Sequence, residues 1–392
     1  MMLQTPIPLP ETADTRLAET PRDWLARYGG DSPVLLVCPE ALSARHDRFR
    51  HGFPGEVTYA VKANPDPGVI GQLAAGGMRG FDVASPAEMT LLRGLCPKAV
   101  LHYHNPVRSR AEIRAGIAAG VASWSVDDMG ELDKLSACGV APGTEVAVRV
   151  KLPVAGAAYD FGTKFGAAPD LALALLTRAT ALGLRVSMTF HVGTQCADPD
   201  AWTAYMAACD GLARAAAVRL ARLNVGGGFP SGRDGAEPEL APIFAAIGRA
   251  HAAFDGAPAL VCEPGRALVA DAMVYAVPIK ARRGAALYLA DGTYGGLSEC
   301  PSIGVPRVDL IAHDHRAPEA TMPFTLFGPT CDSLDRLPGQ TCLPGCAQEG
   351  DWLLFRSAGA YLVGVTTCFN GYGTYEKGLV SRLWTDPARP LG

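Results

Sequence analysis

The sequence has no long hydrophobic run, and none of its apolar stretches approaches the ~18 residues that a membrane-spanning helix needs. Its first 30 residues contain Pro, Asp, Glu and Arg and no apolar segment typical of a signal peptide. An excess of one charge is also absent, since the net charge is −4 over 392 residues. We therefore expect a cytoplasmic protein without a membrane or nucleic-acid partner.

Paired cysteines are missing as well. The eleven cysteines are scattered, with no C-x-x-C pair, and only Cys342 and Cys346 are as close as C-x-x-x-C. An odd, scattered set is typical of reduced thiols rather than of a disulfide framework. With 48% hydrophobic residues the chain can build a large core in two or three domains.

The sequence does contain a regular alternation of short apolar runs with longer Ala- and Leu-rich segments. The runs predict eight strands, at 57–62, 80–84, 99–104, 121–126, 145–151, 185–191, 222–226 and 259–264. Eight β-then-α units in roughly 210 residues predict an α/β fold, a (β/α)₈ barrel. A doubly wound open sheet is the alternative, but the Gly-rich turn expected after its first strand is absent.

The pattern changes after about residue 270. Runs at 273–283, 285–292, 323–328, 351–359 and 361–367 predict strands separated by turns. We expect a barrel domain over 33–270 and a mainly antiparallel β domain over 271–392, with residues 1–32 packing on the second domain. The run at 33–39 is either an extra strand or part of the second domain.

Polar side chains collect at the predicted C-terminal ends of the barrel strands, where such barrels hold their active sites. They are Lys62, Asp82, His102, His104, Arg149, His191, Gly226, Gly227, Gly228, Glu263, Gly265 and Arg266. Glycine-rich backbone lets amide groups approach a phosphate without interference from Cβ. An amine opposite such a site suits a phosphate-bearing aldehyde held as a Schiff base.

Metal-assisted hydrolysis is an alternative reading of the same residues. His102 and His104 would place two imidazoles on one face of a strand. Further ligands could come from His191, Asp82 and Glu263. This hypothesis gives little role to Lys62 and to the glycine-rich turns, and we predict no metal.

Seven short motifs occur around these positions in a fixed order. They are YAVKAN around Lys62, GFDVAS around Asp82, HVGT at 191–194, GGGFP at 226–230, EPGR at 263–266, GPTCDSLD at 328–335 and GAY at 359–361. With KFGA at 164–167 and TTCFNGYG at 366–373, the chain resembles the fold-type III pyridoxal-phosphate decarboxylases, and most of all ornithine decarboxylase of the eukaryotic type. The resemblance runs from about residue 33 to 373.

This resemblance implies an alanine-racemase-like barrel plus β domain, pyridoxal 5′-phosphate (PLP) as cofactor, and decarboxylation of a basic L-amino acid to its amine, with a putrescine-like product. The implied catalytic residues are Lys62, Cys331, His191 and Glu263. The implied cofactor-binding residues are Lys62, Asp82, Arg149, His191, Thr194, Gly227, Gly228, Glu263, Gly265, Arg266 and Tyr361. Lys62 would hold the aldehyde, Glu263 would face the pyridine nitrogen, and His191 would stack on the ring.

The resemblance also implies a homodimer with shared active sites. Cys331, as the acid that reprotonates Cα, and Asp332, as the acceptor of the substrate's distal ammonium, would project into the partner's site. Antizyme inhibitors of the same family lack cofactor residues, but Lys62 and Glu263 are present here. A racemase is a further alternative, and it would need a second base where Cys331 stands.

One segment departs from the family pattern. The stretch 291–310 lacks the Tyr-Asp-His triplet whose aspartate binds the substrate's distal amine in ornithine decarboxylases. Glu299 could supply a carboxylate from another position, so we predict Glu299, Asp332 and Cys331 as substrate-binding residues. The substrate is ornithine-like, or alternatively lysine, arginine, diaminopimelate or a conjugated diamino acid. Arg307 is the candidate cation for a distal carboxylate.

Overall fold

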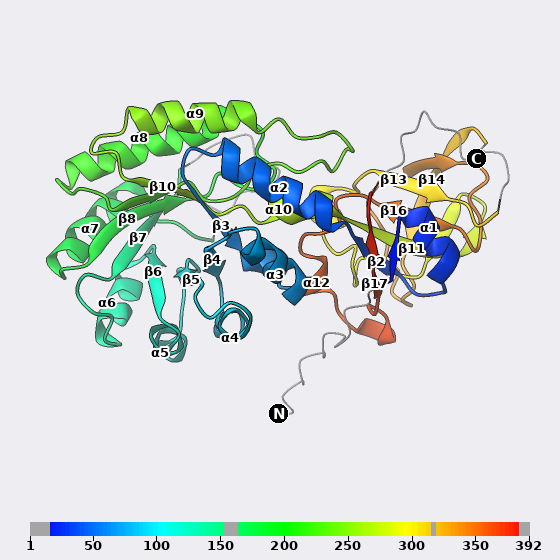
Figure 1. Cartoon of the computed structure of the whole chain (residues 1–392), viewed down its shortest axis with the longest axis horizontal. Helices are drawn as coiled ribbons and strands as arrows, with labels where there is room; N and C mark the ends of the chain where they lie inside the picture. The colour runs from blue at the N-terminus through cyan, green and yellow to red at the C-terminus, as the bar shows by residue number, and fades with distance from the viewer. Residues whose placement is uncertain (1–15, 153–163, 315–318, 384–392) are drawn as a thin grey trace.

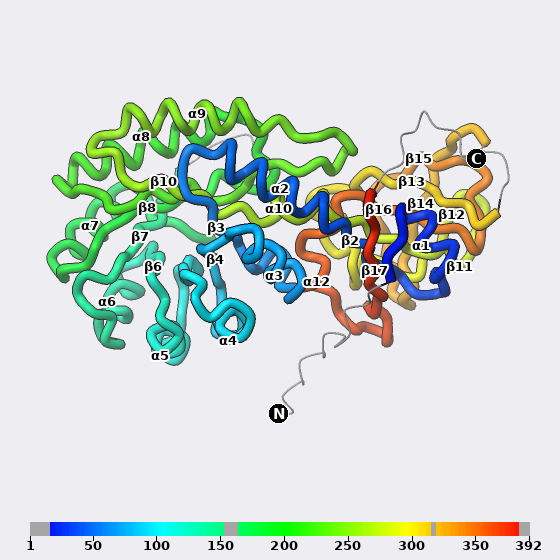
Figure 2. Tube along the Cα trace, viewed as in Figure 1, coloured from blue at the N-terminus to red at the C-terminus, as the bar shows by residue number. Residues whose placement is uncertain are grey.

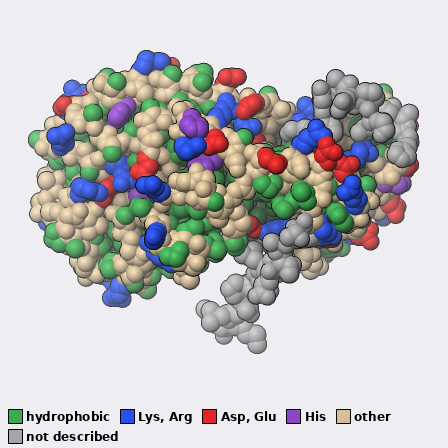
Figure 3. Space-filling view, in the orientation of Figure 1, with side chains coloured by type: hydrophobic (Ala, Val, Ile, Leu, Met, Phe, Trp, Pro, Cys, Tyr) green, Lys and Arg blue, Asp and Glu red, His purple; other side chains and the backbone are tan. Residues whose placement is uncertain are grey.

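The computed structural model describes residues 16–152, 164–314 and 319–383. They form a closed parallel barrel and a separate mixed sheet, which lie side by side along the long axis of the molecule (Figure 1). No helix in these ranges is long and apolar enough to cross a membrane. The face drawn in Figure 3 carries acidic and basic side chains interspersed rather than gathered by sign.

The predicted eight-stranded barrel is confirmed. Its strands pair in parallel in chain order and close between the last and the first; they are β3 (Glu56–Ala60), β4 (Gly80–Val83), β5 (Val100–Tyr103), β6 (Val121–Val126), β7 (Glu145–Val150), β8 (Arg185–Phe190), β9 (Arg222–Asn224) and β10 (Ala259–Cys262). Strands covered on both faces read as continuous apolar runs, which is why the sequence predicted them.

Helices cover the outside of the barrel (Figure 1). They are α3 (Pro67–Ala75), α4 (Pro86–Leu95), α5 (Arg110–Ala118), α6 (Met129–Ala137), α7 (Pro169–Ala181), α8 (Pro199–Ala215) and α9 (Ala241–Ala252). Local sequence starts several of them: Asp66 accepts hydrogen bonds from the Gly68 and Val69 amides at the start of α3, and Ser109 and Glu112 form a capping box on α5.

The second sheet combines both ends of the described chain (Figure 2). Its main path runs through β1 (Leu17–Ala18), β17 (Glu376–Val380), β2 (Val34–Val37), β11 (Met273–Arg283), β12 (Ala286–Leu289), β14 (Thr321–Phe327) and β15 (Thr341–Pro344), while β16 (Trp352–Phe355) joins β11 and β13 (Val308–Ile311). The open question about residues 33–39 is answered by β2, which pairs with β11 and β17 rather than with the barrel.

The other described α-helices are α1 (Pro21–Tyr28), α2 (Pro39–Gly52), the short α10 (Arg266–Val269), α11 (Cys300–Ile303) and α12 (Leu362–Val365). Trp24 of α1 is fully buried against the sheet in a small second core. The larger core is shared by barrel and sheet, so the two parts pack without a solvent layer between them.

Two of the predicted strands differ in the structure, one in its whole length and one at its end. The run 361–367 is not a strand: Tyr361 adopts a left-handed backbone with φ 62°, and the short helix α12 (Leu362–Val365) follows it. The strand predicted at 57–62 stops at Ala60, and Lys62 lies in a 3₁₀ turn over Val61–Ala63. This turn lifts Lys62 out of the pleat of the barrel strand, so its side chain need not be buried among barrel residues.

Candidate active site

A cavity of about 460 Å³ opens at the C-terminal end of the barrel, between the barrel and the β sheet. Its size falls in the usual range for small-molecule sites. Most of the predicted residues line it: Lys62, Arg149, His191, Thr194, Gly227, Gly228, Glu263, Gly265, Arg266, Glu299 and Tyr361. A wider groove between α8 and α9, about 1060 Å³, contains none of them. These eleven predicted residues therefore lie together in the structure.

Lys62 reaches into this cavity with 48% of its side chain exposed, and its Nζ lies 3.9 Å from Asp82 Oδ2. The surrounding protein opposes the ammonium charge, but Asp82, Tyr361 and Glu263 together outweigh this and raise the pKa of Lys62. Lys62 is consequently an ammonium in the structure. A neighbouring acceptor is needed before its nitrogen can act as a nucleophile.

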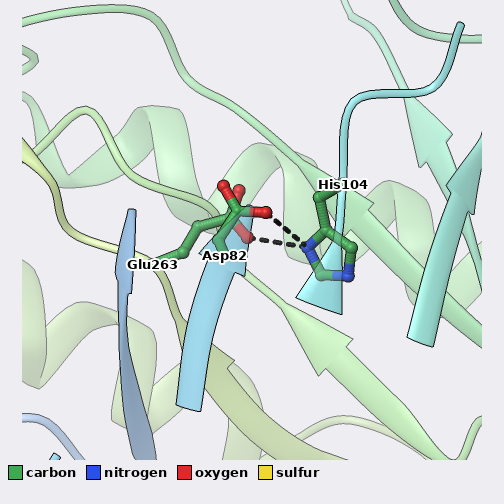
Figure 4. Close-up of side chains that lie close together, drawn as sticks. All are labelled: Asp82, His104 and Glu263. Carbon is green, nitrogen blue, oxygen red and sulfur yellow. Dashed lines mark hydrogen bonds and ion pairs between the residues drawn. The ribbon is translucent and has the colours of Figure 1, made fainter. Parts of the chain in front are cut away.

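Three titratable side chains from different strands meet beside Lys62 (Figure 4). Asp82 lies on β4, His104 follows β5, and Glu263 follows β10. His104 Nδ1 is 2.8 Å from Glu263 Oε2 and 3.9 Å from Asp82 Oδ1. Burial and the repulsion of Glu263 raise the pKa of Asp82 to about 7. Burial acts the same way on Glu263, but His104 and Lys62 overcome it and lower the pKa of Glu263 to about 2.

His191 forms part of the cavity wall as a neutral imidazole. Burial, Arg149 and Lys62 lower the pKa of His191 to about 3. Its Nδ1 accepts a hydrogen bond of 3.0 Å from the Gly193 amide, which sets the ring's orientation. A neutral ring held in this way offers a flat face to an aromatic ligand without adding charge.

Glycines form the part of the wall beside His191, where side chains would not fit. Gly228 has φ +90°, and a Cβ on it would come within 2.1 Å of the Gly193 carbonyl oxygen. A Cβ on Gly265 would come within 2.8 Å of the Ala63 side chain. The backbone is thus exposed directly to the cavity at Gly227, Gly228 and Gly265, as anion-binding loops require.

Arg266 carries the strongest ion pair in the cavity wall, and the sequence did not predict its partner. Its guanidinium makes a two-pronged contact with Glu299, with N–O distances of 2.8 and 2.5 Å. Its Cζ also lies 4.9 Å from the centre of the Tyr361 ring. Burial opposes the charge of Arg266, but Glu299 outweighs it and raises the pKa of Arg266.

Arg149 lies on the other side of the cavity, with its Cζ 5.2 Å from the centre of the Phe165 ring. Burial lowers the pKa of Arg149, although Glu263 and Asp127 act against this effect. Even a lowered value leaves a guanidinium charged near neutral pH. Arg149 therefore supplies a fixed positive charge beside His191.

Cys331 and Asp332 do not line the cavity of their own chain. Both lie after β14, where Cys331 is exposed. Asp332 accepts a 2.5 Å hydrogen bond from the Tyr294 hydroxyl, which lowers the pKa of Asp332. Cys331 Sγ is 3.3 Å from Asn370 Oδ1. Of the predicted site, these two residues are the ones that the fold does not bring to Lys62.

Several residues that sequence reasoning missed belong to the site or support it. Phe165, Gln195, Ser302 and Ile303 line the cavity, and Asn224 donates a hydrogen bond of 2.7 Å to Glu263. Its position two residues before the glycine triplet was the available signal for Asn224. Phe165 lies within the KFGA motif, whose aromatic position was not assigned a role.

The metal reading finds partial geometric support. Asp82, His104 and Glu263 offer ligand atoms within 4.8 Å of one another, and they form the one such group among the described residues. His102 and His191, the other proposed ligands, are not in it. His104 and Asn224 already bond to Glu263 Oε2, whereas Asp82 Oδ1 has no hydrogen-bond partner among the described residues.

The burial of His102 predicts a pH dependence of stability. Burial and the charge of His104 lower the pKa of His102 to about 3, whereas an unfolded histidine titrates near 6.5. Between these values the unfolded chain binds the extra proton, so the free energy of unfolding falls as pH falls from about 6.5 toward 3 and is insensitive to this group above that window.

Replacing His102 with Asn should therefore flatten the dependence by up to one proton, about 1.4 kcal/mol per pH unit. Asn keeps an acceptor for the contact with Ser123 Oγ, which is 2.7 Å from His102 Nδ1. Urea unfolding of the apoprotein at several pH values between 4 and 7 measures the slope. An unchanged slope would contradict the assignment.

Comparison with known proteins adds an independent line of observation. Residues 40–270 match the family model described as "Pyridoxal-dependent decarboxylase, pyridoxal binding domain". An ornithine decarboxylase from Panagrellus redivivus is 31% identical over 374 residues, covering 88% of this chain and 84% of that protein. The matched segment contains the whole barrel.

Solved structures agree with this match. The arginine decarboxylase of Paramecium bursaria Chlorella virus, bound to agmatine, superimposes with a TM-score of 0.82 at 26% identity and covers 91% of this chain and 98% of its own. A lysine/ornithine decarboxylase from Vibrio vulnificus, complexed with putrescine, gives a TM-score of 0.78 at 26% identity, covering 91% and 96%. Both likenesses span the barrel and the β sheet together.

Proposed function

We propose a substrate and a role for each site residue in this chain, which belongs to the pyridoxal-dependent decarboxylase family and is a PLP-dependent decarboxylase of basic amino acids. One observation supports the assignment above all others: Lys62, the glycine-lined wall and Glu263 surround a single cavity. The amine, the anion-binding backbone and the carboxylate are the three groups that PLP chemistry requires of its protein.

The residues present fit PLP. The backbone at Gly227, Gly228 and Gly265, with Arg266 and Tyr361, would hold its phosphate, because these glycines line the cavity with backbone and no Cβ. Thr194 lies in the same wall. When bound, PLP supplies an aldehyde for the substrate's amino group and a protonated ring that withdraws electrons from Cα as CO₂ leaves.

Lys62 and Asp82 prepare the amine. Lys62 Nζ would hold the aldehyde carbon until the substrate's amine replaces it. The ionised form of Asp82 can take the proton that Lys62 must release, because its Oδ2 is 3.9 Å from Nζ. With a pKa of about 7, part of Asp82 is in this form near neutral pH. Arg149 adds positive charge that balances the two buried carboxylates, and His191 orients the ring by stacking.

Glu263 keeps the pyridine nitrogen protonated. A carboxylate with a pKa near 2 stays ionised throughout the physiological range, so it stabilises a proton on a nitrogen opposite it. This charge arrangement favours the transition state, in which negative charge develops at Cα and spreads into the ring.

A second copy of the chain completes the site in our proposal. Cys331 and Asp332 lie on an exposed loop away from their own cavity, which suits a homodimer in which each loop reaches the other subunit's site. Cys331 would return a proton to Cα, and Asp332 would accept the distal ammonium. The barrel over 33–270, apart from β2, would bind the cofactor, and the β domain over 271–392 would carry this loop, with residues 16–32 packed on it.

We propose a linear diamino acid of the ornithine type as substrate and the cytoplasm as the place of action, where the eleven unpaired cysteines would stay reduced. CO₂ release should be compared across ornithine, lysine, arginine, diaminopimelate and citrate-conjugated diamino acids. Release from a diamino acid supports the proposal. No release from any of them, with no PLP bound, would instead favour a regulator of the antizyme-inhibitor kind.

Replacing Glu299 with Ala should change the ranking of these substrates. A phosphate on Arg266 would compete with Glu299 for the guanidinium, and the released carboxylate lines the cavity where a distal ammonium would lie. Loss of one partly buried charge partner is worth about 1–3 kcal/mol, so we expect kcat/KM for the preferred substrate to fall roughly 5- to 150-fold.

The matched control is Ser302→Ala, in the adjacent α11, which removes an uncharged polar group from the same wall. This variant should keep the ranking of the unmodified enzyme. If Glu299→Ala also keeps it, Glu299 does not bind substrate and its role is confined to Arg266.

A further inference from the structure

The carboxylate of Glu263 is held through one of its oxygens. Both His104 Nδ1, at 2.8 Å, and Asn224 Nδ2, at 2.7 Å, contact Oε2 (the histidine contact is drawn in Figure 4). Asn224 Oδ1 accepts the Gly226 amide at 2.8 Å, which fixes the direction of its NH₂ group. Oε1 makes no hydrogen bond to any residue that the structure describes, although the side chain lines the cavity. One oxygen is occupied and the other is free to meet a ligand.

His104 is itself fixed from three sides. Its Nε2 lies 3.1 Å from Ser123 Oγ, and the same hydroxyl lies 2.7 Å from His102 Nδ1. Its carbonyl oxygen accepts a 2.8 Å hydrogen bond from the Ser125 hydroxyl. Its side chain is only 7% exposed. A ring held in this way cannot rotate away from Glu263 without leaving buried groups unpaired.

His104 also decides which carboxylate is ionised. Four charged or titratable groups face it. They are Glu263, which follows β10, Asp82 on β4, Glu145 on β7 and His102 on β5. Glu263 and Asp82 repel each other, so one of two such buried acids tends to hold a proton. The short contact from His104 to Glu263, against 3.9 Å to Asp82, places the proton on Asp82.

We propose that His104 is a positioning residue of this decarboxylase: it holds Glu263 by Oε2 and keeps it ionised, so that Oε1 can pair with a protonated pyridine nitrogen. This inference rests on the function proposed above. Without His104, the proton shared by the carboxylates can move to Glu263, and a neutral Glu263 no longer stabilises the charge on the ring. The expected consequence is a ring nitrogen that loses its proton at lower pH.

The test uses pyridoxine 5′-phosphate, which has the ring and phosphate of PLP but no aldehyde and so binds without reaction. Its ultraviolet absorption reports whether the bound ring nitrogen is protonated. In His104→Ala, the midpoint for loss of that proton should fall by about one pH unit or more relative to the unmodified enzyme. In His104→Asn, whose amide can replace the Nδ1 donor but not the charge, the shift should be smaller.

His102→Asn is the matched control, because His102 is a buried neighbour that contacts Ser123 and not Glu263. It should leave the midpoint unchanged. With substrate, His104→Ala should lower kcat about 10- to 100-fold, as loss of an orienting partner typically does, with a smaller change in KM. If His104→Ala does not fold, His104→Asn still gives a measurable shift.

An unshifted midpoint in both His104 variants would overturn the inference, as would an equal shift in His102→Asn. Failure of the proposed function looks different, since the unmodified enzyme would then bind no pyridoxine 5′-phosphate at all. Binding with a protonated ring in every variant would leave the decarboxylase standing and remove the role of His104.

Discussion

Lys62→Ala should lose at least about three orders of magnitude in CO₂ release, at the upper end of what one positioned catalytic group contributes. Its amine is the one lysine nitrogen among the residues lining the cavity, and it stands beside the carboxylate that can take its proton. A smaller side chain leaves the cavity otherwise intact, so the loss should appear in kcat and not as a failure to fold.

Borohydride reduction separates this outcome from simple destabilisation. The unmodified protein should become permanently labelled by PLP on Lys62, and Lys62→Ala should not. Lys98→Ala serves as the control because Lys98 is exposed on the barrel surface, and it should keep full activity and labelling. More than about a tenth of the activity remaining in Lys62→Ala would contradict the role of Lys62 as the aldehyde-binding amine.

Two inactive variants should become active when mixed. Lys62→Ala lacks the amine in its cavity, and Cys331→Ala lacks the thiol on its exposed loop, expected to cost about 10²- to 10⁴-fold. If each site uses the loop of the other subunit, half of the randomly reassorted dimers carry one intact site of two. Mixing should thus restore about a quarter of the unmodified activity.

The control mixture is Lys62→Ala with Glu263→Ala, since both residues line the same cavity. Each cavity of the mixed dimer then lacks one of the two residues, so this mixture should stay inactive. A second pairing separates a shared site from a site built from one chain: a Lys62→Ala, Cys331→Ala double variant mixed with unmodified chain. In the shared arrangement both sites of that mixed dimer are damaged, whereas in a site built from one chain the unmodified half stays active.

The barrel could be predicted because its strands signal themselves locally. Runs such as Val121–Val126 are apolar, short and bounded by turns, and their partners follow in chain order. The β domain was harder, because β17 pairs with β1 and β2, which lie more than 300 residues earlier. Periodicity carries no information about such distant partners. The apolar run after Tyr361 shows the remaining ambiguity, since it fits a strand and a short helix equally well.

The site residues were predictable from motifs, but their pairings were not. Lys62, Glu263 and the glycines lie within the short sequence motifs, and all of them line one cavity. Arg266 and Glu299 are 33 positions apart, and His104 and Glu263 are 159 apart. Such contacts depend on side-chain direction in the folded barrel, which the sequence pattern does not encode.

The turn that carries Lys62 is also attached to the β domain. The Tyr361 amide donates to the Ala63 carbonyl at 2.6 Å, and Asn64 Nδ2 donates to the Gly359 carbonyl at 2.8 Å. A ligand bound here touches both folding units at their junction, so its binding free energy adds to the cooperativity between them. Loss of the cofactor would remove contacts to both parts, so the apoprotein should unfold at a lower denaturant concentration than the holoenzyme.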